Sequence, residues 1–183
     1  MVFMLTLVLT TLSFGIILIY FIKKKWNGIN IDANPLSIEL FKFARHDDHN
    51  FNLAITNKRN NKITLYYRRK MNALNTTDES FAKRNFPNGY KTLDVECSSL
   101  DSVLSKTKYK DKVIDFLNID VENTEKDVLE SLSFEIYRPK LICVEIHHES
   151  EENLKSNMTY KFLLEKGYKV TWRKEYSFIF LPV

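Results

Sequence analysis

The first 22 residues of the chain carry no charged side chain, and this segment constrains the fold more than any other. An apolar run of about 20 residues is long enough to cross a bilayer as a single helix, so residues 1–25 predict a membrane anchor. The run is followed by Lys23, Lys24 and Lys25, whereas a secretory signal peptide has basic residues before its apolar core. The lysines therefore predict a single-pass membrane protein whose domain lies in the cytoplasm. The alternative is that residues 16–22 form a strand inside the domain.

The charges of the remaining residues nearly cancel. The net charge is +4, but three lysines belong to the first 25 residues, which leaves 24 basic and 23 acidic side chains. A nucleic-acid-binding domain usually carries a basic stripe on its folded part, so we expect no nucleic acid partner. Two distant cysteines are too few for a disulfide framework or a four-ligand zinc site, and we expect no metal centre. Two glycosylation sequons begin at Asn75 and Asn157 and would be modified only if the orientation were reversed.

Residues 27–183 are expected to form one domain, because short apolar runs alternate there with stretches of helical periodicity. Strands are expected at residues 29–33, 51–56, 62–67, 113–121 and 141–146, followed by a hairpin of residues 168–172 and 178–181. Helices are expected after Asn34, around residues 100–104, after a capping-box pattern at Thr124, and over residues 154–163. This alternation is typical of an α/β fold with a mostly parallel sheet.

Glycine is scarce in this chain. Only four glycines occur, and no two of them are close enough to form a GxG, GxGxxG or P-loop sequence. Sites that hold phosphate on a glycine-rich turn therefore lack their usual sequence here.

Polar residues follow three of the expected strands at the point where each strand ends. They are Asp32, then Asp120 with Glu122, then Glu145 with His147. Each acid alone is explained well by a helix cap, but the carboxyl ends of parallel strands form one edge, where open α/β sheets bind ligands. A carboxylate after the second strand suits a ribose, because it accepts hydrogen bonds from two vicinal hydroxyls. The pattern thus predicts a nucleoside cofactor without distinguishing NAD from S-adenosylmethionine (SAM).

The order of several motifs resembles a known family. These motifs are IDANPLSIELF (31–41), FNLAITNKRNNKITLYY (51–67), ALNTTDESFAKR (73–84), TLDVECSSLDSVL (92–104), IDFLNIDVENTEKDVLESL (114–132), RPKLICVEIH (138–147) and FLLEKGYKV (162–170). Over about 150 residues the chain is similar to FkbM-type SAM-dependent methyltransferases. The pairing of IDFL-x-IDVE with RPK-x-x-x-VEIH is more specific than a general Rossmann pattern.

The resemblance implies a SAM-dependent O-methyltransferase whose acceptor is a hydroxyl of a sugar or glycoconjugate. Matching positions assign the cofactor to Asp32, Asn34, Asp120 and Glu122, and the acceptor to Glu145 and His147. Asp32 would hold the SAM ribose, while Asp120 and Glu122 would lie beside the methionine end. Because a general base helps an alcohol to react, Asp120 or His147 is the candidate catalytic residue.

The chain departs from the family pattern at two places. The family sequence DVEG reads Asp120-Val121-Glu122-Asn123 here, and Asn also tolerates left-handed backbone angles. The family begins with a strand and a glycine-rich turn, VIDVGANxG, and nothing similar precedes Asn30. We therefore expect a Rossmann-like methyltransferase sheet that lacks its first, central strand and follows a transmembrane helix. Three explanations are open: a truncated enzyme, a membrane-anchored inactive binding module, or a central strand formed by residues 16–22.

Overall fold

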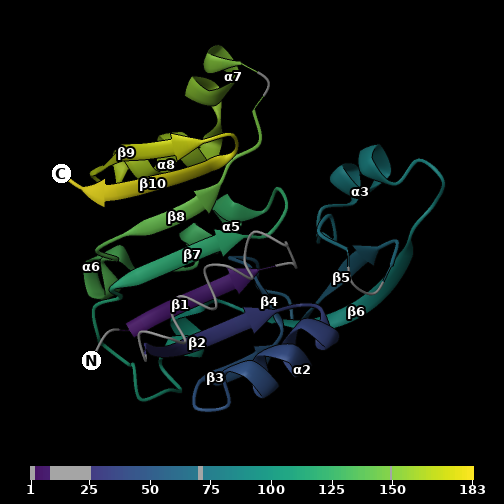
Figure 1. The fold of residues 1–183 in the computed structure, drawn as a ribbon, viewed down its shortest axis with the longest axis horizontal. Coiled ribbons are helices and arrows are strands. Elements are labelled where there is room, and N and C mark those ends of the chain that lie inside the picture. Colours follow the sequence, from purple (N-terminus) through teal and green to yellow (C-terminus); the bar gives the residue numbers. More distant parts are fainter. Residues whose placement is uncertain (1–2, 9–25, 70–71, 149) are drawn as a thin grey trace.

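A seven-stranded sheet forms the body of the protein, and a smaller three-stranded sheet projects from one side of it (Figure 1). The computed structural model describes residues 3–8, 26–69, 72–148 and 150–183. The large sheet has the spatial order β3 (His49–Asn52), β2 (Asn27–Asp32), β1 (Phe3–Val8), β7 (Phe116–Asp120), β8 (Ile142–Glu145), β10 (Ser177–Pro182) and β9 (Tyr168–Lys174). The small sheet has the order β4 (Ala54–Ile55), β6 (Lys91–Ser98) and β5 (Lys62–Tyr67).

The large sheet is wound in two directions from its centre. Strands β3, β2, β1, β7 and β8 are parallel, and β10 is antiparallel to both β8 and β9. The chain moves outward from β1 through β2 to β3 on one side and from β7 to β8 on the other. The direction of winding thus reverses between β1 and β7, and such switch points are where open α/β sheets bind ligands.

The helices in the described part of the chain are short, and several of them pack against a strand that precedes or follows them. They are α2 (Pro35–Ala44), α3 (Glu79–Asn85), α4 (Leu100–Leu104), α5 (Glu125–Glu130), α6 (Phe134–Tyr137), α7 (Glu151–Ser156) and α8 (Met158–Glu165). Helix α2 contacts β2 and β3, whereas α5 contacts β7 and α8 contacts β9. The start of α2 follows from its sequence, because the Asn34 side chain accepts a hydrogen bond from the Leu36 amide and Pro35 occupies the first turn.

The start of the chain forms the central strand of the sheet, contrary to expectation. Leu5 of β1 pairs with Ile29 on one side and with Leu117 on the other, both in parallel. The side chains of Met4, Leu5 and Leu7 are buried. The prediction of a missing first strand is therefore wrong, and so is the membrane-spanning helix over these residues. A strand buried on both faces is a continuous apolar run, which hydropathy alone does not distinguish from part of a membrane helix.

The rest of the predicted anchor lies largely outside the described residues. These are residues 9–25, which include residues 16–22, the alternative candidate for the central strand. The central position in the sheet is occupied by Phe3–Val8. Among the residues that the structure describes, no helix combines the length and the hydropathy needed to cross a bilayer.

Most of the other expected elements are present, but the structure adds a strand and lacks one of the expected helix caps. Strand β6 was not expected, because most of its side chains are exposed and it belongs to the small projecting sheet. The capping box at Thr124 does not form, since the side chain makes no cap hydrogen bond to α5. The Gly167 stop signal is confirmed, with a φ of 77° directly after α8.

Candidate functional site

Three strands of the parallel sheet end in acidic residues at the same edge. Asp32 is the last residue of β2, Asp120 of β7 and Glu145 of β8. Because β1 lies between β2 and β7, Asp32 is two strand spacings, about 10 Å, from Asp120. The structure therefore brings Asp120 and Glu145 together as expected and places Asp32 on the other side of β1.

Asp32 is a buried carboxyl group at the end of β2. The residue is 3% exposed, and its Oδ1 accepts a hydrogen bond from the Asn34 backbone amide at 2.7 Å. Its Oδ2 has no hydrogen-bond partner among the described residues. Burial raises the pKa of Asp32 to about 8, although the bond from the Asn34 amide and the nearby Ser37 hydroxyl oppose this. A carboxylate in this position can accept further hydrogen bonds from a ligand.

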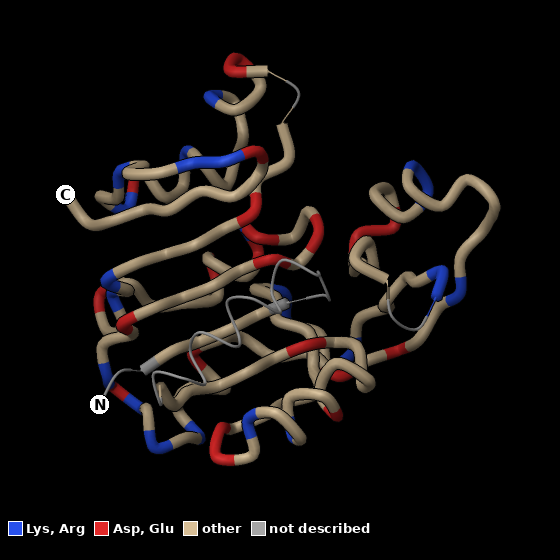
Figure 2. The backbone as a smooth tube through the Cα atoms, viewed as in Figure 1, with Lys and Arg blue, Asp and Glu red and all other residues tan. Residues whose placement is uncertain are grey.

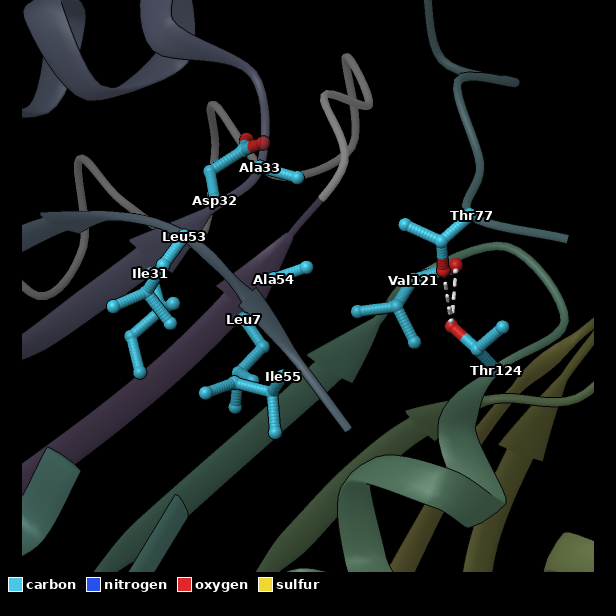
Figure 3. A pocket seen from close by; sticks show the side chains of 10 residues that line it. All are labelled: Leu7, Ile31, Asp32, Ala33, Leu53, Ala54, Ile55, Thr77, Val121 and Thr124. Atoms are coloured by element: carbon cyan, nitrogen blue, oxygen red, sulfur yellow. Dashed lines mark hydrogen bonds between the residues drawn. The ribbon is translucent and has the colours of Figure 1, made fainter. Parts of the chain in front are cut away.

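A pocket opens beside Asp32, at the point where the winding of the sheet reverses. Its polar residues are Asp32, Thr77 and Thr124, and its apolar lining is Leu7, Ile31, Ala33, Leu53, Ala54, Ile55 and Val121. Figure 3 shows Asp32 on one side of the pocket and the two threonines on the other. Instead of capping α5, Thr124 Oγ1 donates to the Val121 carbonyl at 3.2 Å and lies 3.5 Å from Thr77 Oγ1.

A cluster of carboxylates lies at the ends of β7 and β8, where Figure 2 shows acidic residues gathered. Oxygens of Asp120, Glu122 and Glu145 lie within 4.8 Å of one another, and such a set is chemically able to hold a divalent cation. Glu122 and Asn123 have φ angles of 52° and 81°, so the turn after β7 is left-handed at both residues. Glu125 is buried and accepts a hydrogen bond from the Asn123 amide, and burial raises its pKa to about 7.

His147 is paired with this cluster. Its Nε2 lies 3.2 Å from Glu122 Oε2 and 3.9 Å from Glu145 Oε1. The hydrogen bond with Glu122 raises the pKa of His147, and the charges of Glu122, Glu145 and Glu125 act in the same direction against burial. Burial raises the pKa of Glu122, which the hydrogen bond from His147 opposes. His147 therefore holds its proton more tightly than an ordinary histidine and becomes a base only at higher pH.

Two aromatic residues that the sequence did not single out flank the imidazole. The ring centroid of Tyr176, in the turn between β9 and β10, lies 4.8 Å from that of His147, and the Phe81 centroid from α3 lies at 5.8 Å. The motif that contains Phe81 (73–84) gave this residue no role, and no motif contains Tyr176, because each comes from a segment that is distant from His147 in the sequence. Thr77 was missed for the same reason, since it belongs to the segment between β5 and α3.

These features define the class of protein: a doubly wound α/β fold with a ligand pocket at its switch point and a carboxylate after the second strand. The sequence model of the methyltransferase FkbM domain matches residues 17–170 of the chain. The chain therefore belongs to the FkbM methyltransferase family, which confirms the resemblance found in its motifs. Methyltransferases of this kind generally use SAM. Neither the curated proteins nor the solved structures contain a significant match.

Proposed function

We propose that the chain is a SAM-dependent O-methyltransferase that acts on a hydroxyl of a sugar or glycoconjugate. The observation that carries this proposal is the buried Asp32, which lines the pocket. Its Oδ2 has no hydrogen-bond partner among the described residues. A buried polar atom without a partner costs free energy unless a ligand satisfies it. The two hydroxyls of a ribose would donate to this carboxylate, and the apolar lining suits the flat base of a nucleoside.

The acidic cluster complements the rest of the cofactor. SAM supplies a methyl group already activated on a positively charged sulfonium, and its methionine end carries an ammonium group. Asp120 and Glu122 lie beyond β1 from Asp32, where their negative charge favours such cations. The distribution of charge along the edge thus supports binding of the ribose near Asp32 and of the cationic groups near Asp120.

The acceptor would lie beside His147, between the rings of Phe81 and Tyr176. In the transfer, the acceptor oxygen bonds to the methyl carbon while the electrons of the carbon–sulfur bond remain on sulfur. The hydroxyl proton leaves to a base, for which neutral His147 is the first candidate and Asp120 the second. A neutral imidazole that donates from Nε2 to Glu122 keeps Nδ1 as its proton acceptor. Alignment of acceptor and methyl group supplies much of the remaining rate acceleration.

An inactive binding module is the second candidate. It is favoured by the segment between β1 and β2, where the family carries a glycine-rich turn and this chain has the single glycine Gly15. Such a module would keep a ligand pocket but would not position the methyl group for transfer.

Transfer of labelled methyl groups from SAM to a panel of methyl glycosides separates the two candidates. We expect the full chain to methylate at least one glycoside, and His147→Gln to slow the transfer by about 100-fold or more. The matched control is Glu130→Gln, because Glu130 pairs with Lys126 on the exposed side of α5. SAM binding without transfer to any acceptor would favour the inactive module over the enzyme.

A further inference from the structure

A second cavity, of about 140 Å³, lies between the start of α2 and the strands β5 and β6. It is lined by Asn34, Pro35, Leu36, Leu65, Tyr67, Asn75 and Leu93, none of which lines the pocket beside Asp32. The two cavities are neighbours. Ala33 of the first precedes Asn34 of the second in the chain, and Thr77 of the first lies two positions after Asn75 of the second.

Asn75 is the unusual residue of this cavity. It is 1% exposed, yet neither its Nδ2 nor its Oδ1 has a hydrogen-bond partner among the described residues. A primary amide offers two donors and an acceptor, and in proteins the large majority of such buried groups are satisfied. Asn75 thus lines the cavity and carries a buried donor and acceptor that have no partner among the described residues.

The backbone around Asn75 is held firmly. The Asn75 amide donates to the Asn72 carbonyl at 3.3 Å, and the next residue forms a two-bond bridge with Tyr66 of β5 at 2.8 and 3.1 Å. Thr76 Oγ1 also donates to the Glu122 carbonyl at 2.6 Å. These bonds fix the main chain from which the Asn75 side chain projects, which lowers the cost of ordering it on binding.

The remaining lining is mostly apolar, with the polar groups of Asn34 and Tyr67, and is partly open to solvent. Leu36 and Leu93 are 37% and 39% exposed, which is high for large aliphatic side chains, while Leu65 is buried. Asn75 itself begins a glycosylation sequon, but its burial leaves no room for a glycan in the folded chain. The cavity thus combines mainly apolar walls with the amides of Asn34 and Asn75 and contains no charged side chain among its described lining residues.

We propose that this cavity is a second ligand-binding site, in which Asn75 pairs with a flat, uncharged group that carries a donor beside an acceptor. Carboxamides, lactams and nucleobase edges belong to this chemical class. Two parallel hydrogen bonds with the Asn75 amide would fix the ligand, and its ring would pack between Leu36, Tyr67 and Leu93. A charged ligand is disfavoured, because no described lining residue would replace its water with an opposite charge.

Benzamide is a suitable probe, with benzoate as the matched charged ligand and NMR of the full ¹⁵N-labelled chain as the readout. We expect benzamide to shift the side-chain NH₂ resonances of Asn75, with benzoate causing no such shift. Asn75→Leu should weaken benzamide binding by at least tenfold, while Asn57→Leu, an exposed asparagine that pairs with Glu130, should leave it unchanged. Leu93→Trp at the exposed rim is a second variant that should also weaken binding if Asn75→Leu does not fold.

Saturating SAM distinguishes this site from the first pocket. Benzamide should bind equally well with and without SAM. If SAM does not bind at all, the proposed function fails, but the proposal for this second site still stands. The proposal is overturned if benzamide leaves the Asn75 resonances unmoved, if Asn75→Leu and Leu93→Trp bind it normally, or if SAM displaces it.

Discussion

Gly28 of β2 lies so close to Met4 of β1 that no side chain fits between them. The two residues are paired in the parallel ladder, and a Cβ added to Gly28 would lie 2.9 Å from the carbonyl carbon of Met4 and closer still to its oxygen. This contact ties the start of the chain to the second strand of the sheet. It also accounts for one of the few glycines of the sequence by close packing of two backbones.

The substitution Gly28→Ala should therefore destabilise the protein strongly. We expect a loss of about 3 kcal/mol or more in the free energy of unfolding, measured by urea denaturation, because the clash is with backbone. Gly89→Ala is the matched control: nothing lies within 4 Å of the added Cβ, so only the left-handed φ of 94° costs about 1–2 kcal/mol. Equal losses in the two variants would argue against β1 as the partner of β2.

The sequence predicted the parallel sheet well but misplaced its centre. The strands around Ile31, Ile119 and Val144 follow from short apolar runs bounded by polar residues, and these strands are present. The start of the chain was ambiguous, because a buried parallel strand and a membrane helix share the same uninterrupted hydropathy. Pairing in the sheet resolves the ambiguity for Phe3–Val8, and pairing is long-range information that local patterns do not contain.

Asp32→Asn should make the protein more stable at neutral pH. The folded-state pKa of about 8 exceeds the unfolded value of 3.8. The contribution of this carboxyl to the free energy of unfolding is therefore complete below pH 3.8 and is lost as the pH rises through 8. An amide does not titrate, so the variant should gain up to about 4 kcal/mol at pH 7 and nothing near pH 3. Thermal denaturation across this pH range measures the gain, and Asp47→Asn in an exposed loop is the control. A gain that does not change with pH would contradict the account.

Cofactor binding should release a proton from the same carboxyl. At pH 7 a group with a pKa of about 8 is mostly protonated, and a ribose that donates hydrogen bonds favours the charged form. Calorimetry in buffers of different ionisation enthalpy should show release of up to roughly 0.9 proton per SAM bound at pH 7, falling towards zero at pH 10. Binding without proton release at pH 7 would show that the ligand does not reach Asp32.

The pH dependence of methyl transfer should report the pairing of His147 with Glu122. A base must be neutral, and the hydrogen bond with Glu122 raises the pKa of His147, so the rate should rise with pH through a value above 6.5. Glu122→Gln removes the negative charge and should move this rise to lower pH, whereas Glu130→Gln should not. An unchanged profile in Glu122→Gln would favour Asp120 as the base.

The candidate site was only partly visible in the sequence. Asp120, Glu122, Glu145 and His147 could be expected together, because strand ends on one edge of a parallel sheet meet and all four lie at the ends of two neighbouring strands. Phe81 and Tyr176 could not be expected, since they approach His147 from a separate helix and from a hairpin turn. The cavity beside Asn75 also depends on how β5 and β6 meet α2, which no local motif encodes.

Calorimetric titration of the full chain with SAM tests the central claim most directly. We predict a dissociation constant below about 100 μM, and at least tenfold weaker binding to Asp32→Ala, because the ribose loses its hydrogen-bond acceptor. Asp47→Asn should bind as the unaltered chain does, since Asp47 is exposed and outside the pocket. Absence of heat at millimolar SAM, or equal affinity in Asp32→Ala, would contradict the assignment of this pocket to the cofactor.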